Sequence, residues 1–311
     1  MSNAARQPAP GQRDAQEGGQ AELFRNLMVG ALDCVALSDG YVEGPIKISA
    51  PEIAEDQLKD FLASCGLSTE RGRTTISCLL VRGYRGEDML IDSGIGMLPG
   101  PNGLPIPTAG RLPAALAAAG IDPGTIRTIL ISHIHPDHIG GLFDADDQPL
   151  FPAAHYYVSQ EEIDFWGTEP DLDGTLMPPR MRVETIWAAQ RFLDLAKDRI
   201  VAFRAGEDVL PGVETILLDG HTPGQVGFVF DAGDDKLFYT ADAAGHRFIS
   251  VGHPDWRFSF DTDAPLAITT RKRLIELAID TGWSMFTPHF TWPALGKMTR
   301  RDGEAVWQPT S

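Results

Sequence analysis

The stretch His-Ile-His-Pro-Asp-His-Ile-Gly-Gly at residues 133–141 decides the fold, because it places three of the chain's eight histidines within six residues. It follows Thr128–Ser132, an apolar run typical of a buried strand. Side chains two residues apart on an extended chain point to the same side, so His133 and His135 face one ion together. The stretch therefore predicts a metal centre at the end of a strand.

Pro136 ends that extended run, and the turn after it directs Asp137 and His138 toward a second ion. Imidazole and carboxylate groups are the ligands that suit zinc and its first-row neighbours. A catalytic zinc typically takes about three protein ligands and keeps one position for water. The motif alone thus supplies more ligands than one ion needs.

Three further ligand-type residues follow later strand-like runs. His221 lies in the turn Gly220–Gly224 after one strand, Asp242 follows Lys236–Thr240, and His289 follows Trp283–Pro288. The complete set suits two ions with one bridging carboxylate, and its carboxylates Asp137 and Asp242 are the predicted catalytic residues. The predicted metal ligands are His133, His135, Asp137, His138, His221, Asp242 and His289.

The rest of the chain alternates strand-like and helical patterns, with early strands mostly in pairs and helices interspersed later. This order predicts an α+β fold, a mixed sheet sandwich covered by helices, in one domain over residues 23–311. The expected strands are Val29–Leu37, Thr75–Val81, Met89–Asp92, Thr128–Ser132, His155–Val158, Val213–Leu218, Val226–Phe230 and Lys236–Thr240. The expected helices are Gln57–Ser64, Leu112–Ala119, Glu161–Trp166, Arg182–Lys197 and Leu266–Asp280.

Two stretches are expected to be irregular. Gly94–Gly110 contains four prolines and five glycines in 17 residues, too many for a regular element. Ala243–Asp263 carries several aromatic residues, and long ordered loops of this kind often form lids or binding loops.

Composition excludes several classes of protein. The chain has 311 residues and a formal charge of −17, which argues against a nucleic-acid surface. No apolar run approaches the roughly 20 residues of a membrane helix, and three cysteines do not form a disulfide framework. Residues 1–22 are polar and are expected to be a disordered tail. A cytoplasmic location is expected, or a periplasmic one if an export signal has been trimmed.

The order of these motifs resembles the metallo-β-lactamase superfamily, and within it the methyl parathion hydrolase type. The matching stretches are Ala36–Gly40, residues 133–141, Glu161–Trp166, Gly220–Gly224 and Phe260–Asp263. The resemblance implies an αββα sandwich with the metals at one edge between the sheets. It also implies that His133, His135 and His221 hold one ion, that Asp137, His138 and His289 hold the other, and that Asp242 bridges them. A homodimer is a further implication.

One departure concerns the residue after Gly224, where many members carry a second histidine and this chain has Gln225. The family's ligand is the first histidine of that motif, so His221 still matches. Trp166 matches a family position at an aromatic-lined substrate entrance. The other predicted substrate contacts are chosen because they follow Asp242 or His289 in the sequence: Phe248, Trp256 and Phe258, with Phe290 and Trp292 as further candidates.

The predicted function is a dinuclear zinc hydrolase in which a metal-bridging hydroxide attacks a phosphotriester, an aryl ester or a lactone. Manganese, cobalt or iron are alternatives to zinc. A quorum-quenching lactonase acting on N-acyl homoserine lactones uses the same seven ligands and stays open as an alternative. An iron oxidoreductase on the same scaffold is a further alternative, while a nucleic-acid hydrolase and a non-catalytic binding module are disfavoured. His246 is a weak candidate for a proton donor to the leaving group.

Overall fold

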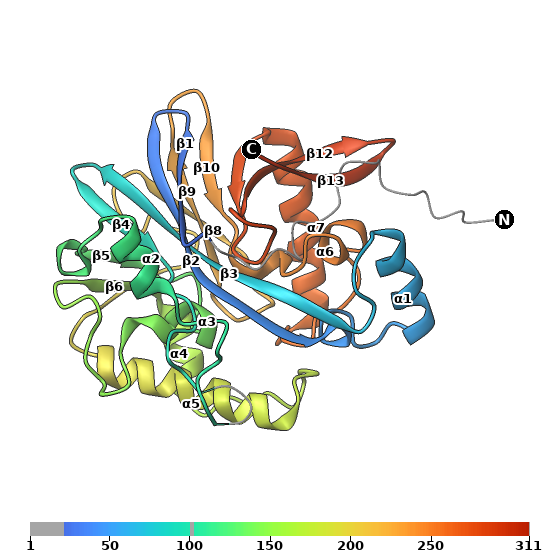
Figure 1. Cartoon of the computed structure of the whole chain (residues 1–311), viewed down its shortest axis with the longest axis horizontal. Coiled ribbons are helices and arrows are strands. Elements are labelled where there is room, and N and C mark those ends of the chain that lie inside the picture. The colour runs from blue at the N-terminus through green and yellow to red at the C-terminus, as the bar shows by residue number, and fades with distance from the viewer. Residues whose placement is uncertain (1–21, 100–102, 311) are drawn as a thin grey trace.

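The computed structural model describes residues 22–99 and 103–310, in which two β-sheets pack face to face between helices (Figure 1). The predicted tail at residues 1–22 lies outside the described residues except for Glu22. The first sheet has the order β1-β2-β3-β4-β5-β6-β7, with antiparallel pairs up to β4 and parallel pairs after it. Its strands are Phe24–Val29, Leu32–Pro45, Arg71–Tyr84, Glu87–Ile91, Thr128–Leu130, His155–Ser159 and Ile200–Phe203.

The second sheet has the order β13-β12-β11-β10-β9-β8, and its one parallel pair joins β10 to β11. Its strands, from β8 to β13, are Val213–Leu217, Val226–Asp231, Lys236–Tyr239, Ser284–Phe286, Leu295–Arg301 and Glu304–Pro309. The helix α7 connects β10 to the parallel neighbour β11, as a crossover between parallel strands requires.

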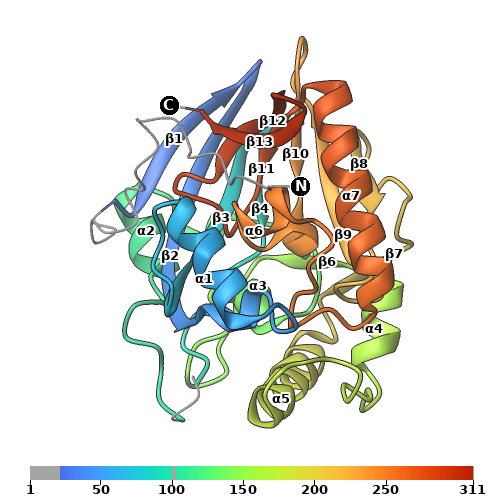
Figure 2. The same ribbon diagram turned by 90° about the vertical axis from the view of Figure 1, so that its right-hand side faces the viewer.

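Helices cover both outer faces, and Figure 2 shows α2 and α7 on opposite sides of the two sheets. This arrangement confirms the predicted αββα sandwich. The helices α1 to α7 are Glu55–Ser64, Leu112–Ala118, Pro136–Ile139, Gln160–Trp166, Pro179–Ala196, Ile249–Gly252 and Ala264–Thr281. Within the described ranges, none of these helices has the length and apolar character needed to cross a membrane.

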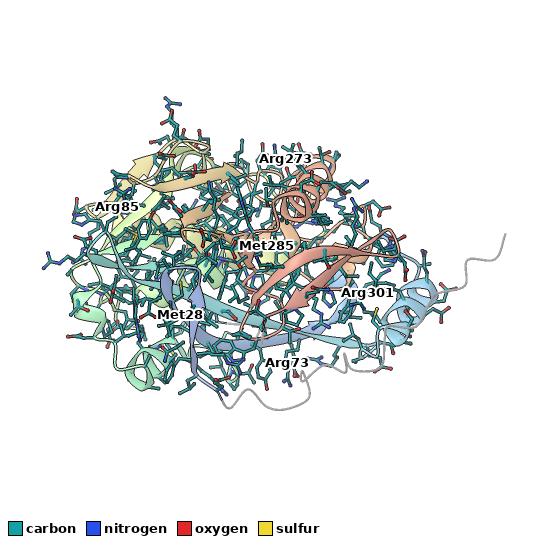
Figure 3. All side chains as sticks on the ribbon, turned by 90° about the horizontal axis from the view of Figure 1, so that it is seen from above. Met28, Arg73, Arg85, Arg273, Met285 and Arg301 are labelled. Carbon is teal, nitrogen blue, oxygen red and sulfur yellow. The ribbon has the colours of Figure 1, made fainter. Side chains whose placement is uncertain are left out.

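Strand alternation divides the core into layers. In β3, Leu79 packs between the two sheets, whereas its neighbour Leu80 packs under the helices of the first sheet. In β9, Phe228 faces the other sheet, whereas Val229 packs with the helices over the second sheet. Figure 3 shows Met285 inside this packing and the charged ends of the exposed Arg85 and Arg301 at the periphery.

Several predicted boundaries are wrong. The strand expected at Val29–Leu37 is the end of β1 and the start of β2, joined by a tight turn in which Gly30 has φ +52°. A Cβ on Gly30 would lie 2.1 Å from the carbonyl oxygen of Ala232, so the turn needs glycine there. The expected loop Ala243–Asp263 contains the short helix α6. The strands β7, β12 and β13 are missing from the prediction, because short or half-exposed strands lack a clear alternation.

The proline-rich loop at residues 94–110 is irregular, as predicted, and a single buried carboxylate holds it. Asp39 lies at the bulge of β2 and accepts four backbone hydrogen bonds from this loop and the start of α2. The donors are the N–H groups of Ile95 at 2.8 Å, Gly96 at 3.2 Å, Gly110 at 3.3 Å and Leu112 at 2.9 Å.

The loop packs directly on the histidine motif. Gly141 donates its N–H to the carbonyl of Gly94 at 3.2 Å. A Cβ on Gly96, which has φ +55°, would lie 2.5 Å from the carbonyl oxygen of Gly140. The two glycines after His138 therefore let this loop approach the metal-binding segment, and Asp39 fixes the loop there.

Asp39 gives a testable pH dependence of stability. Burial raises the pKa of Asp39 to about 6 from 3.8, although four backbone N–H groups favour the charged form. The folded protein therefore binds this proton more tightly than the unfolded chain does. The contribution of Asp39 to the free energy of unfolding is expected to be largest below about pH 4 and to fall as the pH rises to about 6. Asp39→Asn is expected to remove this decline in urea unfolding experiments.

The control is Asp146→Asn, which changes an exposed aspartate. If the wild type and Asp39→Asn keep the same difference in unfolding free energy from about pH 4 to about pH 7, the raised pKa is contradicted.

Candidate metal centre

All seven predicted ligands meet at one edge of the sandwich, where strands of both sheets end. The first sheet supplies the motif at residues 133–138 after β5. The second sheet supplies His221 after β8, Asp242 in the 3₁₀ turn Ala241–Ala244 after β10, and His289 after β11. Ligand atoms of these residues approach one another closely enough to hold metal ions.

One half of this cluster, the three-histidine half, consists of His133, His135 and His221. The Nε2 atom of His133 lies 3.1 Å from Nδ1 of His135, and the Nε2 atom of His221 lies 3.0 Å from the same Nδ1. All three rings are buried. Three nitrogens that converge from three directions fit the tetrahedral preference of zinc with one position left over.

The other half, the Asp137 half, consists of Asp137, His138 and His289. The Nε2 atom of His289 lies 3.5 Å from one oxygen of Asp137, and the Nε2 atom of His138 lies 3.8 Å from the other. Asp242 lies between the halves: its Oδ1 is 2.9 Å from His289 Nε2, and its Oδ2 is 3.6 Å from His221 Nε2. Its two oxygens therefore face different halves, as a bridging carboxylate requires.

Hydrogen bonds behind the rings fix which nitrogen faces the centre. His138 donates its Nδ1–H to Asp92 at 2.6 Å, His221 donates to Asp261 at 3.2 Å, and His289 donates to the carbonyl of Thr75 at 2.7 Å. Each of these bonds leaves the Nε2 lone pair directed inward. This is the tautomer that a metal ligand needs.

His133 obeys the same rule through a hydroxyl group. The hydroxyl of Ser132 donates to Asp92 at 2.7 Å and lies 3.1 Å from His133 Nδ1, so it accepts the proton of that ring. Asp92 also accepts from Tyr239 at 2.7 Å. One carboxylate at the end of β4 therefore supports one ligand in each half.

The pKa shifts follow from this crowding. Burial and the neighbouring histidines lower the pKa of His133 and His135 well below 6.5, so both are neutral donors of lone pairs. At His289 burial also disfavours the charged ring, but Asp242 and Asp137 outweigh it and raise the pKa to about 9. Despite its burial, His289 and His138 hold the pKa of Asp242 well below its ordinary value. A divalent cation would replace protons in the Asp137 half.

Two buried polar atoms test whether a metal fits. His138 Nε2 and Asp242 Oδ1 lie 3.3 Å apart, and neither makes a hydrogen bond of acceptable geometry among the described residues. Buried polar groups are normally satisfied, so unsatisfied atoms aimed at one point indicate a missing partner. A metal ion is the partner that accepts lone pairs from both a neutral imidazole and a carboxylate.

Gln225, the departure from the family pattern, supports the centre instead of weakening it. Its amide donates to the carbonyl of Leu218 at 2.9 Å, and its carbonyl accepts from the N–H of Asp242 at 3.3 Å. The side chain therefore links the turn that carries His221 to the turn that carries Asp242.

The aromatic candidates have different positions. Trp166 is fully buried, with its ring 5.6 Å from that of His135, so it lies behind this ligand and not at an open entrance. Phe258 is half-buried and stacks on His221 at 5.8 Å, and Phe260, which was not predicted, lies 6.3 Å from His135. These two phenylalanines form an apolar wall beside the three-histidine half.

The other candidates contact different parts of the molecule. Trp256 stacks on His253 at 3.9 Å and packs with α1, and Phe248 packs under the guanidinium of Arg247. His246 accepts the N–H of Ile249, which orients its ring toward α6. Phe290 packs against Trp307, and Trp292 donates to Glu22.

Sequence reasoning missed three buried acids behind the ligands: Asp92, Glu162 and Asp261. Asp92 ends a predicted strand, and Asp261 lies within a stretch used for the family resemblance. Asp261 accepts from His221 and forms a buried ion pair with Arg271 at 3.1 Å. The position of Asp92 at the end of a predicted strand, close to the histidine motif, was the sequence feature that could have predicted its role behind the ligands.

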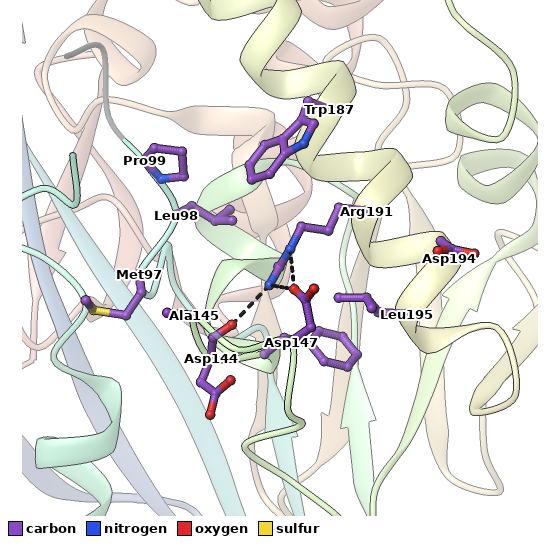
Figure 4. Close-up of a pocket in the computed structure, with 11 residues that line it drawn as sticks. Met97, Leu98, Pro99, Asp144, Ala145, Asp147, Trp187, Arg191, Asp194 and Leu195 are labelled. Carbon is purple, nitrogen blue, oxygen red and sulfur yellow. Dashed lines mark hydrogen bonds and ion pairs between the residues drawn. The ribbon is translucent and has the colours of Figure 1, made fainter. Parts of the chain in front are cut away.

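A separate cavity of about 540 Å³ lies between the loop that begins at Gly94 and the helix α5 (Figure 4). Met97, Leu98 and Pro99 form one wall, and Trp187 and Arg191 form the other. Arg191 is held by Asp147 at 2.5 Å. None of the seven predicted ligands lines this cavity, so it is distinct from the metal centre.

Comparison with known proteins agrees with this geometry. The solved structure of AidC, a dizinc quorum-quenching lactonase in complex with its product N-hexanoyl-L-homoserine, is 30% identical with a TM-score of 0.84 and covers 93% of this chain and 97% of its own. A hydrolase named AbOPH, described as a member of the β-lactamase superfamily, is 24% identical with a TM-score of 0.82. The match covers 94% of this chain and 99% of AbOPH.

Among curated proteins, a probable metallo-hydrolase of Mycobacterium bovis is 26% identical over 244 residues, which are 73% of this chain and 73% of that protein. The family model of the metallo-β-lactamase superfamily matches residues 71–289, from β3 to the last predicted ligand. With its αββα sandwich and its cluster of histidines and aspartates, this chain belongs to the metallo-β-lactamase superfamily and is a metal-dependent hydrolase.

Proposed function

We propose that this protein is a dinuclear metal-dependent lactonase that hydrolyses N-acyl homoserine lactones. The observation that carries the proposal is the likeness to AidC over 93% of the chain, combined with a full set of seven ligand-type side chains at one point. The likeness extends over 93% of this chain and 97% of AidC, which supports a common substrate class.

The ligand set divides between two ions. His133, His135 and His221 would hold one, Asp137, His138 and His289 the other, and Asp242 would contact both. Two zinc ions held there would supply Lewis acidity and would lower the pKa of a water to near neutrality. The neutral form of His133 and His135 suits this role, because their lowered pKa values keep both lone pairs available at neutral pH.

The chain's own residues define the rest of the substrate site. Phe258 and Phe260 lie 5.2 Å apart beside the three-histidine half and offer apolar surface to an acyl chain. The five histidine ligands and Asp242 are buried, which strengthens electrostatic interactions at the reacting carbonyl, while Asp137 is partly exposed. Opening a lactone ring releases a basic alkoxide, which takes up a proton as the attacking water gives one up. His246 is turned toward α6 and is therefore not placed to carry that proton.

The metal stoichiometry tests the two-ion arrangement. The wild type is expected to retain two equivalents of zinc per chain after dialysis, measured by inductively coupled plasma mass spectrometry. His135→Ala is expected to lose one equivalent, because it removes one nitrogen from the three-histidine half.

The matched control is His155→Ala, which changes an exposed histidine and should retain both equivalents. A single equivalent in the wild type would contradict the dinuclear proposal. Iron with a visible absorption spectrum would favour the oxidoreductase alternative.

Substrate preference tests the lactonase assignment. The zinc-loaded protein is expected to show a kcat/KM for N-hexanoyl-L-homoserine lactone at least about 100-fold above that for methyl parathion, a transition-state preference of about 2.7 kcal/mol. His135→Ala is expected to reduce lactone turnover by more than about 100-fold, whereas His155→Ala should not.

A phosphotriester preference of the same size would instead support the methyl parathion hydrolase type. Turnover of neither substrate would refute the substrate class while leaving the family membership intact.

A further inference from the structure

Glu162 is a fully buried acid that the proposed chemistry does not use. It lies in the first turn of α4, whose N-terminal cap is Ser159. The hydroxyl of Ser159 accepts the N–H of Glu162 at 3.3 Å and donates to the carbonyl of Gly224 at 2.8 Å. The start of α4 is therefore attached to the turn that carries His221.

The carboxylate of Glu162 contacts both segments of the three-histidine half. Its Oε2 accepts from the N–H of Ile134 at 2.8 Å, and its Oε1 accepts from the hydroxyl of Thr222. Ile134 is the residue between His133 and His135, and Thr222 directly follows His221. One carboxylate thus connects the backbone of two ligands from the first sheet to the residue beside the third ligand from the second sheet.

A third contact reaches the ligand rings from behind. Glu162 Oε2 also accepts from the indole N–H of Trp166 at 2.9 Å, one helical turn further along α4. The ring of Trp166 packs edge-on against that of His135. Glu162 therefore fixes the position of the side chain that backs this ligand.

The Asp137 half has different supports. His138 is held by Asp92 through its ring and by Ser93 through its carbonyl, and His289 is held by Thr75. The hydrogen bonds described for Glu162 go to none of these residues. Asp92 supports both halves, His138 directly and His133 through Ser132, whereas the bonds of Glu162 go to the three-histidine half alone.

We propose that Glu162 is a positioning residue that sets the metal affinity of the three-histidine half alone. This inference rests on the proposed two-ion function. Without the carboxylate, Ile134, Thr222 and Trp166 lose their common partner, and the three ring nitrogens no longer share one fixed geometry. Changes of this kind behind metal ligands typically cost about 10–100-fold in affinity.

Competition with a chromogenic chelator measures the two affinities in Glu162→Ala, with zinc and with cobalt(II). One equivalent is expected to bind about 10–100-fold more weakly, and the other to stay within about twofold. In the cobalt protein, NMR of the exchangeable imidazole N–H protons identifies the half. The three-histidine half contributes three such protons and the Asp137 half contributes two, and only the set of three should weaken.

Glu162→Gln separates the contacts from the charge. Its carbonyl oxygen accepts from Ile134 and Trp166, and its amide donates to the hydroxyl of Thr222, so affinity close to that of the wild type is expected. Asp39→Asn is the matched control, because it changes another buried carboxylate that bonds to a loop packed on the Asp137 half. It should leave the set of three N–H signals unchanged.

The proposal would be overturned if Glu162→Ala weakened the binding of both metal equivalents equally or of neither. It would also be overturned if Glu162→Gln bound metal as weakly as Glu162→Ala. If Glu162→Ala does not fold, Thr222→Val removes a single contact and is expected to lower the metal affinity of the three-histidine half by a smaller factor. An unchanged affinity in Thr222→Val would also overturn the proposal.

No substrate enters this experiment, so its result does not depend on lactone turnover. A wild type that binds one equivalent contradicts the two-ion function, while the N–H signals still report the effect of Glu162.

Discussion

The burial of five imidazoles around Asp242 is the constraint on which the rest of the structure depends. A buried histidine ring needs a partner for each nitrogen, and the nitrogen that faces the centre must be unprotonated to bind a metal. Four of the five rings have an acceptor behind them: Asp92 for His138, Asp261 for His221, the carbonyl of Thr75 for His289 and the hydroxyl of Ser132 for His133. The outer nitrogen of His135 has no such partner among the described residues. The segments that carry these acceptors must therefore pack directly behind the histidine rings.

The acceptors need partners of their own, so the network extends outward. Asp261 is neutralised by Arg271 of α7, which also donates to the carbonyl of Ala243 at 3.0 Å. Asp92 receives the hydroxyl of Tyr239 from the other sheet. Asp261 thus connects the centre to α7, and Asp92 connects ligands of both halves to the second sheet.

The sequence was sufficient for the seven ligand-type residues and the layer order, because the histidine motif and the strand ends are local patterns. Strand and helix periodicity located most elements of the first 240 residues. It failed for β12 and β13, a hairpin at the sheet edge with mixed polarity. Trp166 was predicted as a substrate contact from the family resemblance and Trp256 from its proximity to Asp242 along the chain, and neither argument shows which cluster a ring joins after folding.

The buried acids were the harder part. Glu161 and Glu162 are adjacent glutamates, and only the helical phase that places Glu162 one turn before Trp166 separates the buried one from its half-buried neighbour. Asp39 lies in a stretch that matches the family, but its role could not be predicted because its four partners lie 56–73 residues away. Long-range backbone donors leave no trace in composition or spacing.

The ligands of each half come from both sheets, which has a consequence for the life of the protein in a cell. An ion bound there is a cross-link between two layers that otherwise touch mainly through apolar side chains. A ligand that binds only the folded state stabilises it by mass action, so the folded fraction rises with the free concentration of the ion. The steady-state amount of this protein would then depend on the supply of metal. A low metal concentration would raise the unfolded fraction and expose the chain to proteolysis, in addition to lowering activity.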